Sequence, residues 1–276
     1  MTSSRPARRF DWNNLGMRAA SAAVLIPAVL GSIFLGPVFL VVIAIAVALL
    51  AFEWTGMSAP RARGVSAVIL TAFVLAALFA AYRHNFLLAW SLVALGAFAA
   101  GWFAYFSAER PGDAAFGVVY IAAPCLALTW LRAMPNPIGW TILLFAITWS
   151  ADIFAYVAGN TLKGAKLWPS LSPNKTWSGL VGGLIGAMAT AMVVAASPYS
   201  TARLSLGAAA MIGLAGGVAT MAGDLCESML KRRFGVKDSG DLIPGHGGLF
   251  DRVDGLLFAV LAVAGARLIY ESGWAR

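Results

Sequence analysis

Residues 38–56 read VFLVVIAIAVALLAFEWTG, an apolar run in which Glu53 is the only charged side chain. A helix needs roughly 20 apolar residues to cross the hydrocarbon core of a bilayer. In lipid the backbone polar groups must be satisfied within the segment, which favours a helix. A membrane barrel would instead show short strands of alternating polarity. This stretch therefore predicts a transmembrane helix.

The same pattern recurs along the whole chain. Its 276 residues are 60% hydrophobic and only 12% charged, about half the charged share of a soluble domain. Proline and glycine breaks separate the apolar runs. We therefore predict an all-α polytopic membrane protein with about nine transmembrane helices. The predicted spans cover residues 19–35, 38–56, 65–82, 86–106, 115–132, 138–158, 176–197, 203–229 and 253–270.

The polar segments divide the chain into three parts. Residues 1–18 are polar and basic, and no cleavage pattern of a signal peptide follows them, so we interpret them as a cytoplasmic N-terminal arm. Residues 19–135 are expected to form N-terminal transmembrane helices. Residues 136–276 are expected to form a catalytic transmembrane region, in which residues 159–175 and 230–252 are long functional loops.

The distribution of basic residues predicts the orientation. With the N-terminus inside, 15 of the 20 lysines and arginines, including every lysine, fall on the inner side. Positive charge is enriched on the cytoplasmic side of membrane proteins, so both long loops should face the cytoplasm. The net charge of +8 is spread over loops and forms no basic face interleaved with aromatic residues, which argues against nucleic acid as a partner. Anionic lipid or a phosphorylated substrate fits better.

The loop at 230–252 is the most highly charged part of the chain. Its basic side chains and glycines suit phosphate oxygens, and its carboxylates suit a hard divalent cation. Asp251 and Asp254 are three positions apart, so both would point to one face if a helix begins there. The alternative is a solvated loop that merely follows the positive-inside rule.

Acidic residues within predicted spans are a second signal. A carboxylate at membrane depth costs roughly 2.5–3.5 kcal/mol on insertion scales, so it tends to mark function. Asp224 and Glu227 lie near the end of one span, and Asp152 lies inside another. The alternative for Asp152 is a hydrogen bond or ion pair between helices. For Glu53 we expect an interfacial anchor or a structural partner.

Residues 172–179 read SPNKTWSG, a turn followed by a helix start. A helix N-terminus with hydroxyls and a lysine can bind an anion, although an ordinary helix cap would look the same. We expect Gly182, Gly183 and Gly186 to permit close helix packing. Aromatic residues near span ends are interpreted as an interfacial belt, and these are Trp54, Trp102, Tyr120 and Trp177.

Histidine and cysteine add little. His246 lies between glycines and could be a general acid, a phosphate ligand or a turn residue. With two histidines in the chain, no zinc site can be assembled from histidine alone. Cys125 and Cys226 lack CxxC spacing and are interpreted as small core residues.

Residues 228–254 resemble the signature of the phosphatidate cytidylyltransferase family. They read SMLKRRFGVKDSGDLIPGHGGLFDRVD and match every specified position of S-x-[apolar]-K-R-x4-K-D-x-[small]-x2-[apolar]-[PGS]-x-H-G-G-[apolar]-x-D-R-[apolar]-D. The similarity continues upstream. Further elements of the family pattern are Asp152-x3-Tyr156-x2-Gly159, Ser172-Pro-x-Lys175-Thr-Trp-x-Gly179 and Gly223-Asp224-Leu-x-Glu227-Ser228.

The resemblance implies a reaction in which CTP and phosphatidate give CDP-diacylglycerol and pyrophosphate. It also implies magnesium dependence, with a potassium ion in some relatives. The implied fold is a helical membrane homodimer, in the bacterial inner membrane, with its site facing the cytoplasm.

Specific roles follow from the resemblance together with the charges. We assign cation binding to Asp224, Asp251 and Asp254. Neutralisation of phosphate charge is assigned to the basic residues Lys231, Arg232, Lys237 and Arg252, and His246 is kept as a ligand or proton carrier. Further substrate contacts are expected from Asp152, Ser172, Pro173, Lys175, Thr176, Ser228, Asp238, Gly247 and Gly248.

Three rival functions stay open. A transporter would also explain acidic residues within spans, but it needs neither the HGG stretch nor the lysine–arginine cluster. An enzyme that uses a CDP-lipid as donor should carry D-G-x2-A-R-x8-G-x3-D-x3-D, which is absent because Leu256 and Leu257 follow Asp254-Gly255. The same chemistry on an ether-lipid phosphate is the third alternative.

Overall fold

The computed structural model describes residues 31–169, 171–197, 204–242 and 247–273. Within these ranges, eight helices are long and apolar enough to cross a membrane, which confirms the predicted all-α polytopic class. The first predicted span, 19–35, lies mostly outside the described residues. The helices are α2 (Gly36–Ser58), α3 (Arg63–Tyr82), α4 (Phe86–Phe106), α5 (Pro111–Ala133), α6 (Pro137–Leu162), α7 (Trp177–Ala196), α8 (Leu206–Arg233) and α9 (Phe250–Glu271).

The helix starts follow local sequence rules. Proline occupies the first turn of α2, α5 and α6, where its missing N–H would have had no helical partner in any case. Thr176 caps α7 by accepting a hydrogen bond from Gly179 N at 3.1 Å. This contact confirms the predicted helix start at Thr176, but the turn predicted just before it is wrong, because residues Ser172–Thr176 form a β-strand. A short 3-10 helix, Pro60–Ala62, links α2 to α3.

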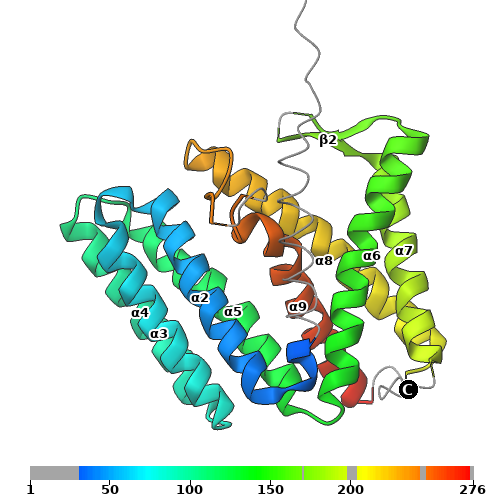
Figure 1. Cartoon of the computed structure of the whole chain (residues 1–276), viewed down its shortest axis with the longest axis horizontal. Helices are drawn as coiled ribbons and strands as arrows, with labels where there is room; N and C mark the ends of the chain where they lie inside the picture. The colour runs from blue at the N-terminus through cyan, green and yellow to red at the C-terminus, as the bar shows by residue number, and fades with distance from the viewer. Residues whose placement is uncertain (1–30, 170, 198–203, 243–246, 274–276) are drawn as a thin grey trace, which may run out of the picture.

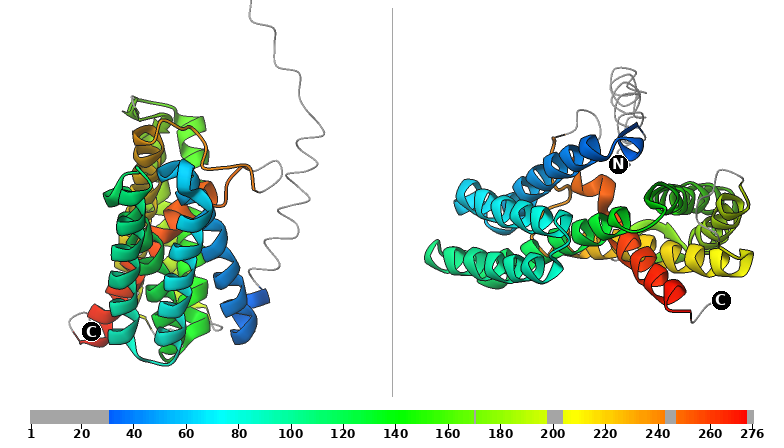
Figure 2. Two further views of the ribbon diagram at one scale, coloured as in Figure 1. Left: turned by 90° about the vertical axis from the view of Figure 1, so that its left-hand side faces the viewer. Right: turned by 90° about the horizontal axis from the view of Figure 1, so that it is seen from below.

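The helices run up and down in two groups (Figure 1). Helices α2 to α5 pack together, and α6 to α8 form the second group. Helix α9 lies between them and contacts both α5 and α8 (Figure 2). Large apolar side chains such as Phe79, Leu87 and Phe98 are exposed on the outer helices. Such surfaces are expected where helices face lipid.

The two long polar segments reach the same face of the molecule, as predicted (Figure 1). The first is partly a β-hairpin, in which β1 (Lys166–Trp168) pairs antiparallel with β2 (Ser172–Thr176). Helix α6 continues to Leu162 before the hairpin begins. The second segment connects α8 to α9. We call this end of the molecule the loop face.

Glycines let α6 and α7 approach closely, as expected from the sequence. A Cβ atom on Gly179 would lie 2.9 Å from Ala155 O, and one on Gly183 would lie 2.8 Å from Ala151 O. A Cβ on Gly182 would lie 2.3 Å from the Ala158 side chain. Small residues at such crossings allow tight packing of transmembrane helices, and here the packing fixes the hairpin above α6 and α7.

Candidate active site

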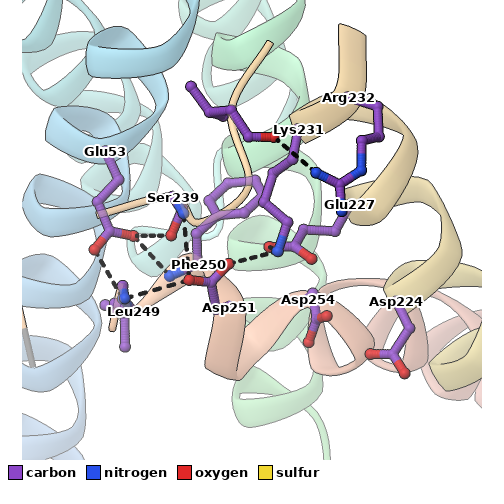
Figure 3. A network of polar contacts seen from close by, with 12 residues as sticks. Glu53, Asp224, Glu227, Lys231, Arg232, Ser239, Leu249, Phe250, Asp251 and Asp254 are labelled. Atoms are coloured by element: carbon purple, nitrogen blue, oxygen red, sulfur yellow. Dashed lines mark hydrogen bonds and ion pairs between the residues drawn. The ribbon is translucent and has the colours of Figure 1, made fainter. Parts of the chain in front are cut away.

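Two glycines bring α8 and α9 together where their acidic residues lie. A Cβ on Gly223 would lie 2.4 Å from Asp254 O, and one on Gly255 would lie 2.8 Å from Thr220 Cγ2. Only hydrogen fits at these positions. The neighbouring carboxylates of Asp224 and Asp254 consequently lie beside each other (Figure 3).

Residues from α6 and the hairpin complete this cluster. Lys175 on β2 forms an ion pair with Asp224, and both side chains are about a quarter exposed. Asp152 on α6 is close enough to interact electrostatically with Asp224 and Lys175. We call Asp152, Lys175, Asp224 and Asp254 the acid cluster. The structure therefore brings together four residues that the sequence placed in four separate segments.

The acid cluster has more negative charge than its own lysine can balance. Adjacent carboxylates repel unless protons or cations neutralise them. Mg²⁺ is commonly held by one or two carboxylates together with water and substrate phosphates. No group of three or more histidine, cysteine, aspartate or glutamate residues with metal-binding geometry occurs in the described ranges. The Asp224–Asp254 pair therefore fits a cation whose remaining ligands come from substrate and water.

Asp251 belongs to a different set of contacts. Its Oδ1 accepts a hydrogen bond from Lys231 Nζ at 2.7 Å, and Lys231 also pairs with Glu227 at 2.8 Å. Its Oδ2 accepts from the backbone N–H groups of Ser239 and Gly248, each at 3.3 Å. Both oxygens of Asp251 and the ammonium of Lys231 are thus engaged within the protein (Figure 3).

Glu53 on α2 holds the start of α9. Its side chain is fully buried, and it accepts hydrogen bonds from Leu249 N at 2.8 Å and Phe250 N at 2.7 Å. It also accepts one from Ser239 Oγ at 3.2 Å. A carboxylate at a helix N-terminus satisfies free N–H groups and interacts favourably with the helix dipole. We call Glu53, Ser239, Gly248, Leu249 and Phe250 the Glu53 latch.

The glycines of the HGG stretch fit this latch closely. A Cβ on Gly248 would lie 1.9 Å from Ser239 Oγ and 2.9 Å from Glu53 Oε1. Gly247 has a φ of +83°, a conformation that side chains disfavour. Gly248 thus packs closely against Ser239 and Glu53, and its predicted contact with substrate stays a prediction. His246 lies outside the described residues.

An aromatic cluster packs against the latch through Phe250. Trp54 stacks on Tyr120, which stacks on Phe250, with ring centroids 5.5 Å apart in each pair. Trp54 is 0% exposed and Tyr120 8%, so assigning these two residues to an interfacial belt was wrong. They are buried because α5 and α9 pack against the C-terminal end of α2. Trp102 and Trp177 are exposed.

A buried carboxylate that sequence reasoning missed ties α5 to α8. Asp113 Oδ1 lies 2.5 Å from Arg233 Nη2, and the Asp113 backbone oxygen accepts a hydrogen bond from Trp54 Nε1 at 3.1 Å. Asp113 is 5% exposed. The sequence did carry a signal for Asp113, because it is an acidic residue at the start of a largely apolar segment. Glu53 stands out in the same way, as the single acid in residues 38–56.

The remaining predicted residues lie around the loop face. Arg232, Lys237, Asp238 and Arg252 are exposed, whereas Ser228 is half-buried in α8. Ser172 and Pro173 lie on β2 beside Lys175, and Thr176 is buried as the cap of α7. Exposed cations near a pair of acidic residues suit a polyanionic substrate that carries its own metal ion.

These features define an integral membrane protein with a polar, acid-bearing site at one membrane face. The family model described as "Cytidylyltransferase family" matches residues 16–269, and the chain belongs to this family. It is 37% identical over 267 residues to the phosphatidate cytidylyltransferase of Brucella abortus biovar 1 (strain 9-941), covering 95% of this chain and 94% of the relative. It is also 32% identical over 271 residues to the enzyme of that name from Pseudomonas aeruginosa, covering 94% and 98%.

A third relative matches only part of the chain. The chain is 41% identical over 150 residues to the phosphatidate cytidylyltransferase of Rickettsia bellii (strain RML369-C), covering 51% of this chain and 63% of that relative. Membership of the family makes a transporter of unrelated mechanism a poor account of the loop face.

Proposed function

We propose that this protein transfers the cytidylyl group of CTP to phosphatidate, giving CDP-diacylglycerol and pyrophosphate for phospholipid synthesis. The observation that carries the proposal is the pairing of Asp224 with Asp254 beside Lys175, in a chain whose full-length relatives bear this activity in their names. One substrate is a lipid and the other a soluble polyanion. A site at a membrane face with exposed cations suits both of them.

The reaction is a phosphoryl-type substitution. An oxygen of the phosphatidate phosphate attacks the α-phosphorus of CTP, and a new P–O bond forms. The bond from the α-phosphorus to the oxygen bridging the β-phosphate breaks, and pyrophosphate leaves with that electron pair. Because the attacking phosphate is already ionised, no strong base is needed. Positioning and charge neutralisation provide most of the rate enhancement.

We assign the roles in this reaction from the contacts of each residue. Asp224 and Asp254 would hold Mg²⁺, which supplies neutralisation of phosphate charge when bound. Lys175 exchanges its contact with Asp224 for a phosphate oxygen as substrate enters. The exposed cations Arg232, Lys237 and Arg252 bind the outer phosphates.

Asp251 and Lys231 were first assigned to the metal and the phosphates, and we propose a supporting role for them instead. In this proposal they shape the segment that carries the HGG stretch, because each is engaged by the other and by backbone donors. Hydrogen-bonded carboxylates also serve as metal ligands, so the first assignment of Asp251 to the cation stays a prediction. His246 stays a proposed ligand or proton carrier, on the sequence alone.

The setting of the enzyme is proposed on similar grounds. We propose an inner-membrane protein with the loop face toward the cytoplasm, because that face carries most of the lysines and arginines. CTP is available on that side. A homodimer and a bound potassium ion are proposed from the family resemblance alone.

The proposal is tested by pyrophosphate release from the purified protein. CTP, phosphatidate and magnesium are supplied together and then omitted one at a time, with potassium present throughout. We expect release only with all three, together with a CDP-lipid product. An ether-linked lipid phosphate supplied in place of phosphatidate tests the alternative acceptor. Absence of release from folded protein, or ion uptake without CTP consumption, would overturn the assignment.

A further inference from the structure

The membrane face opposite the loop face contains a cavity of about 480 Å³. It is formed by the start of α2 and the ends of α3 and α5. Its lining includes Phe39 and Leu40 from α2, Tyr82 and His84 near the end of α3, and Thr129 and Arg132 from α5. The cavity is therefore apolar on one side and polar or cationic on the other.

Arg132 is the unusual member of this lining. Its guanidinium lies over the ring of Phe39, with Cζ 4.6 Å from the centroid. One nitrogen, Nη1, is buried and has no hydrogen-bond partner among the described residues. An arginine stays charged in any protein environment, and the Arg132 side chain is only partly buried, so the rest of its guanidinium is open to the cavity. A cation in a lining without an acidic residue suits an anionic ligand.

The protein itself offers no anion there within the described ranges. None of the residues lining the cavity is acidic. At this face the described acid is Glu271, whose carboxylate already pairs with Arg267 at 2.8 Å. An external anion is therefore the simplest partner for the positive charge of Arg132.

Arg267 shows how the same fold treats a structural arginine. Its side chain is 1% exposed and pairs with Glu271. It also donates to Leu131 O at 3.3 Å and Pro135 O at 2.5 Å, and its Cζ lies 4.9 Å from the Trp140 ring centroid. Every side of this guanidinium is engaged. Arg132, at the same face, lies over the ring of Phe39 and lines a cavity that has no acidic residue in its lining.

We propose that this cavity binds the headgroup of an anionic phospholipid at the membrane face opposite the acid cluster. Arg132 donates to the phosphate oxygens. The apolar side of the cavity, with Phe39 and Leu40, receives the beginning of the lipid chains. Exposed Phe34, Leu35 and Val38 continue this apolar surface along the membrane-facing side. A lipid provides both the anion and the apolar body, whereas free phosphate provides only the anion.

Lipid retention by native mass spectrometry tests the proposal. The whole protein is purified, exchanged into detergent and offered phosphatidylglycerol or phosphatidylcholine at equal concentration. We expect a preference for the anionic lipid that falls about tenfold in Arg132→Gln, since a lost charge-assisted contact of ~1.4 kcal/mol corresponds to that factor. Arg132→Lys should keep part of the preference.

Arg83→Gln is the matched control, because Arg83 is an exposed cation at the same face that does not line the cavity. It should retain the wild-type preference. Equal preference in wild type and both Arg132 variants would overturn the proposal. Inorganic phosphate that raises the thermal midpoint of wild type as much as phosphatidylglycerol would reassign the site to a soluble anion and overturn the lipid assignment. These readouts do not depend on cytidylyl transfer.

Discussion

The Glu53 latch and the acid cluster lie near the same end of α9 but use their carboxylates differently. In the latch, Glu53 is fully buried and receives three hydrogen bonds from groups of the protein. In the acid cluster, Asp224 has Lys175 as its described ion-pair partner, and Asp254 accepts from the N–H of Gly255 at 2.8 Å. The carboxylate of the latch is saturated by donors of the protein, whereas the carboxylates of the acid cluster keep oxygen atoms available for a cation or another ligand.

The difference separates residues that build the site from residues that act in it. A buried carboxylate whose hydrogen-bond donors all belong to the protein stabilises the fold, because its loss leaves those donors without a partner. In our proposal Asp251 and Lys231 fall on the structural side of this division. Substitutions in each set of residues test the distinction.

The largest expected effect is on turnover in the acid cluster. Asp224→Asn and Asp254→Asn should each reduce turnover by roughly a thousandfold or more, because a carboxylate ligand to a catalytic cation is lost. The thermal midpoint in detergent should change little, because the Lys175–Asp224 pair is partly exposed and neither aspartate belongs to the Glu53 latch. Pyrophosphate release and a melting curve measure the two quantities. Activity retained in both variants would refute the proposed metal ligands.

Removing the carboxylate of the latch should lower both stability and activity. Glu53→Ala leaves two backbone N–H groups and the Ser239 hydroxyl without an acceptor. Each such group costs about 1–3 kcal/mol when buried, so we expect a loss of roughly 3 kcal/mol or more in the free energy of unfolding. Glu53→Gln is the control, because it keeps one carbonyl acceptor and should lose less. An unchanged unfolding midpoint in Glu53→Ala would show that the latch is not structural.

A clash at the HGG stretch should have an intermediate effect that a second change relieves. Gly248→Ala places a Cβ where Ser239 Oγ lies, and overpacking of this kind costs about 1–3 kcal/mol. Adding Ser239→Ala removes that oxygen and should restore part of the stability. A double variant no more stable than the single one would argue that the glycine serves substrate directly, as the sequence first suggested.

The smallest expected effect separates the two arginines near Asp113. Arg110 is 72% exposed and lies 3.9 Å from Asp113 Oδ2, so Arg110→Gln should change the free energy of unfolding by about 0.5 kcal/mol or less. Arg233→Gln removes the closer partner at 2.5 Å and should cost more. Chemical unfolding of the two variants in the same detergent makes the comparison. Equal losses would mean that Asp113 is held by its backbone contacts alone.

Much of the fold was predictable because lipid imposes a simple rule. Uninterrupted apolar runs predicted the eight described spans, and the sequence already placed Asp224 and Asp254 in the site. The contacts of Glu53 were not predictable, since its donors lie 186 to 197 positions away in the chain. The pairing of Asp251 with Lys231, 20 positions apart, was not predictable either. The presence of charged residues in a loop does not show whether a carboxylate contacts substrate or a neighbouring lysine.

The position of Glu53 has a consequence for how the protein is made. Glu53 and the Phe250 N–H that it accepts from are separated by 197 positions. At ribosomal speeds of about 5–20 residues per second, α2 enters the membrane roughly 10 to 40 seconds before its partner exists. The Glu53 carboxylate has no donor from α9 while six further helices, α3 to α8, are inserted. Activity therefore begins only when the last helix arrives, and a nascent chain interrupted earlier has no way to consume CTP.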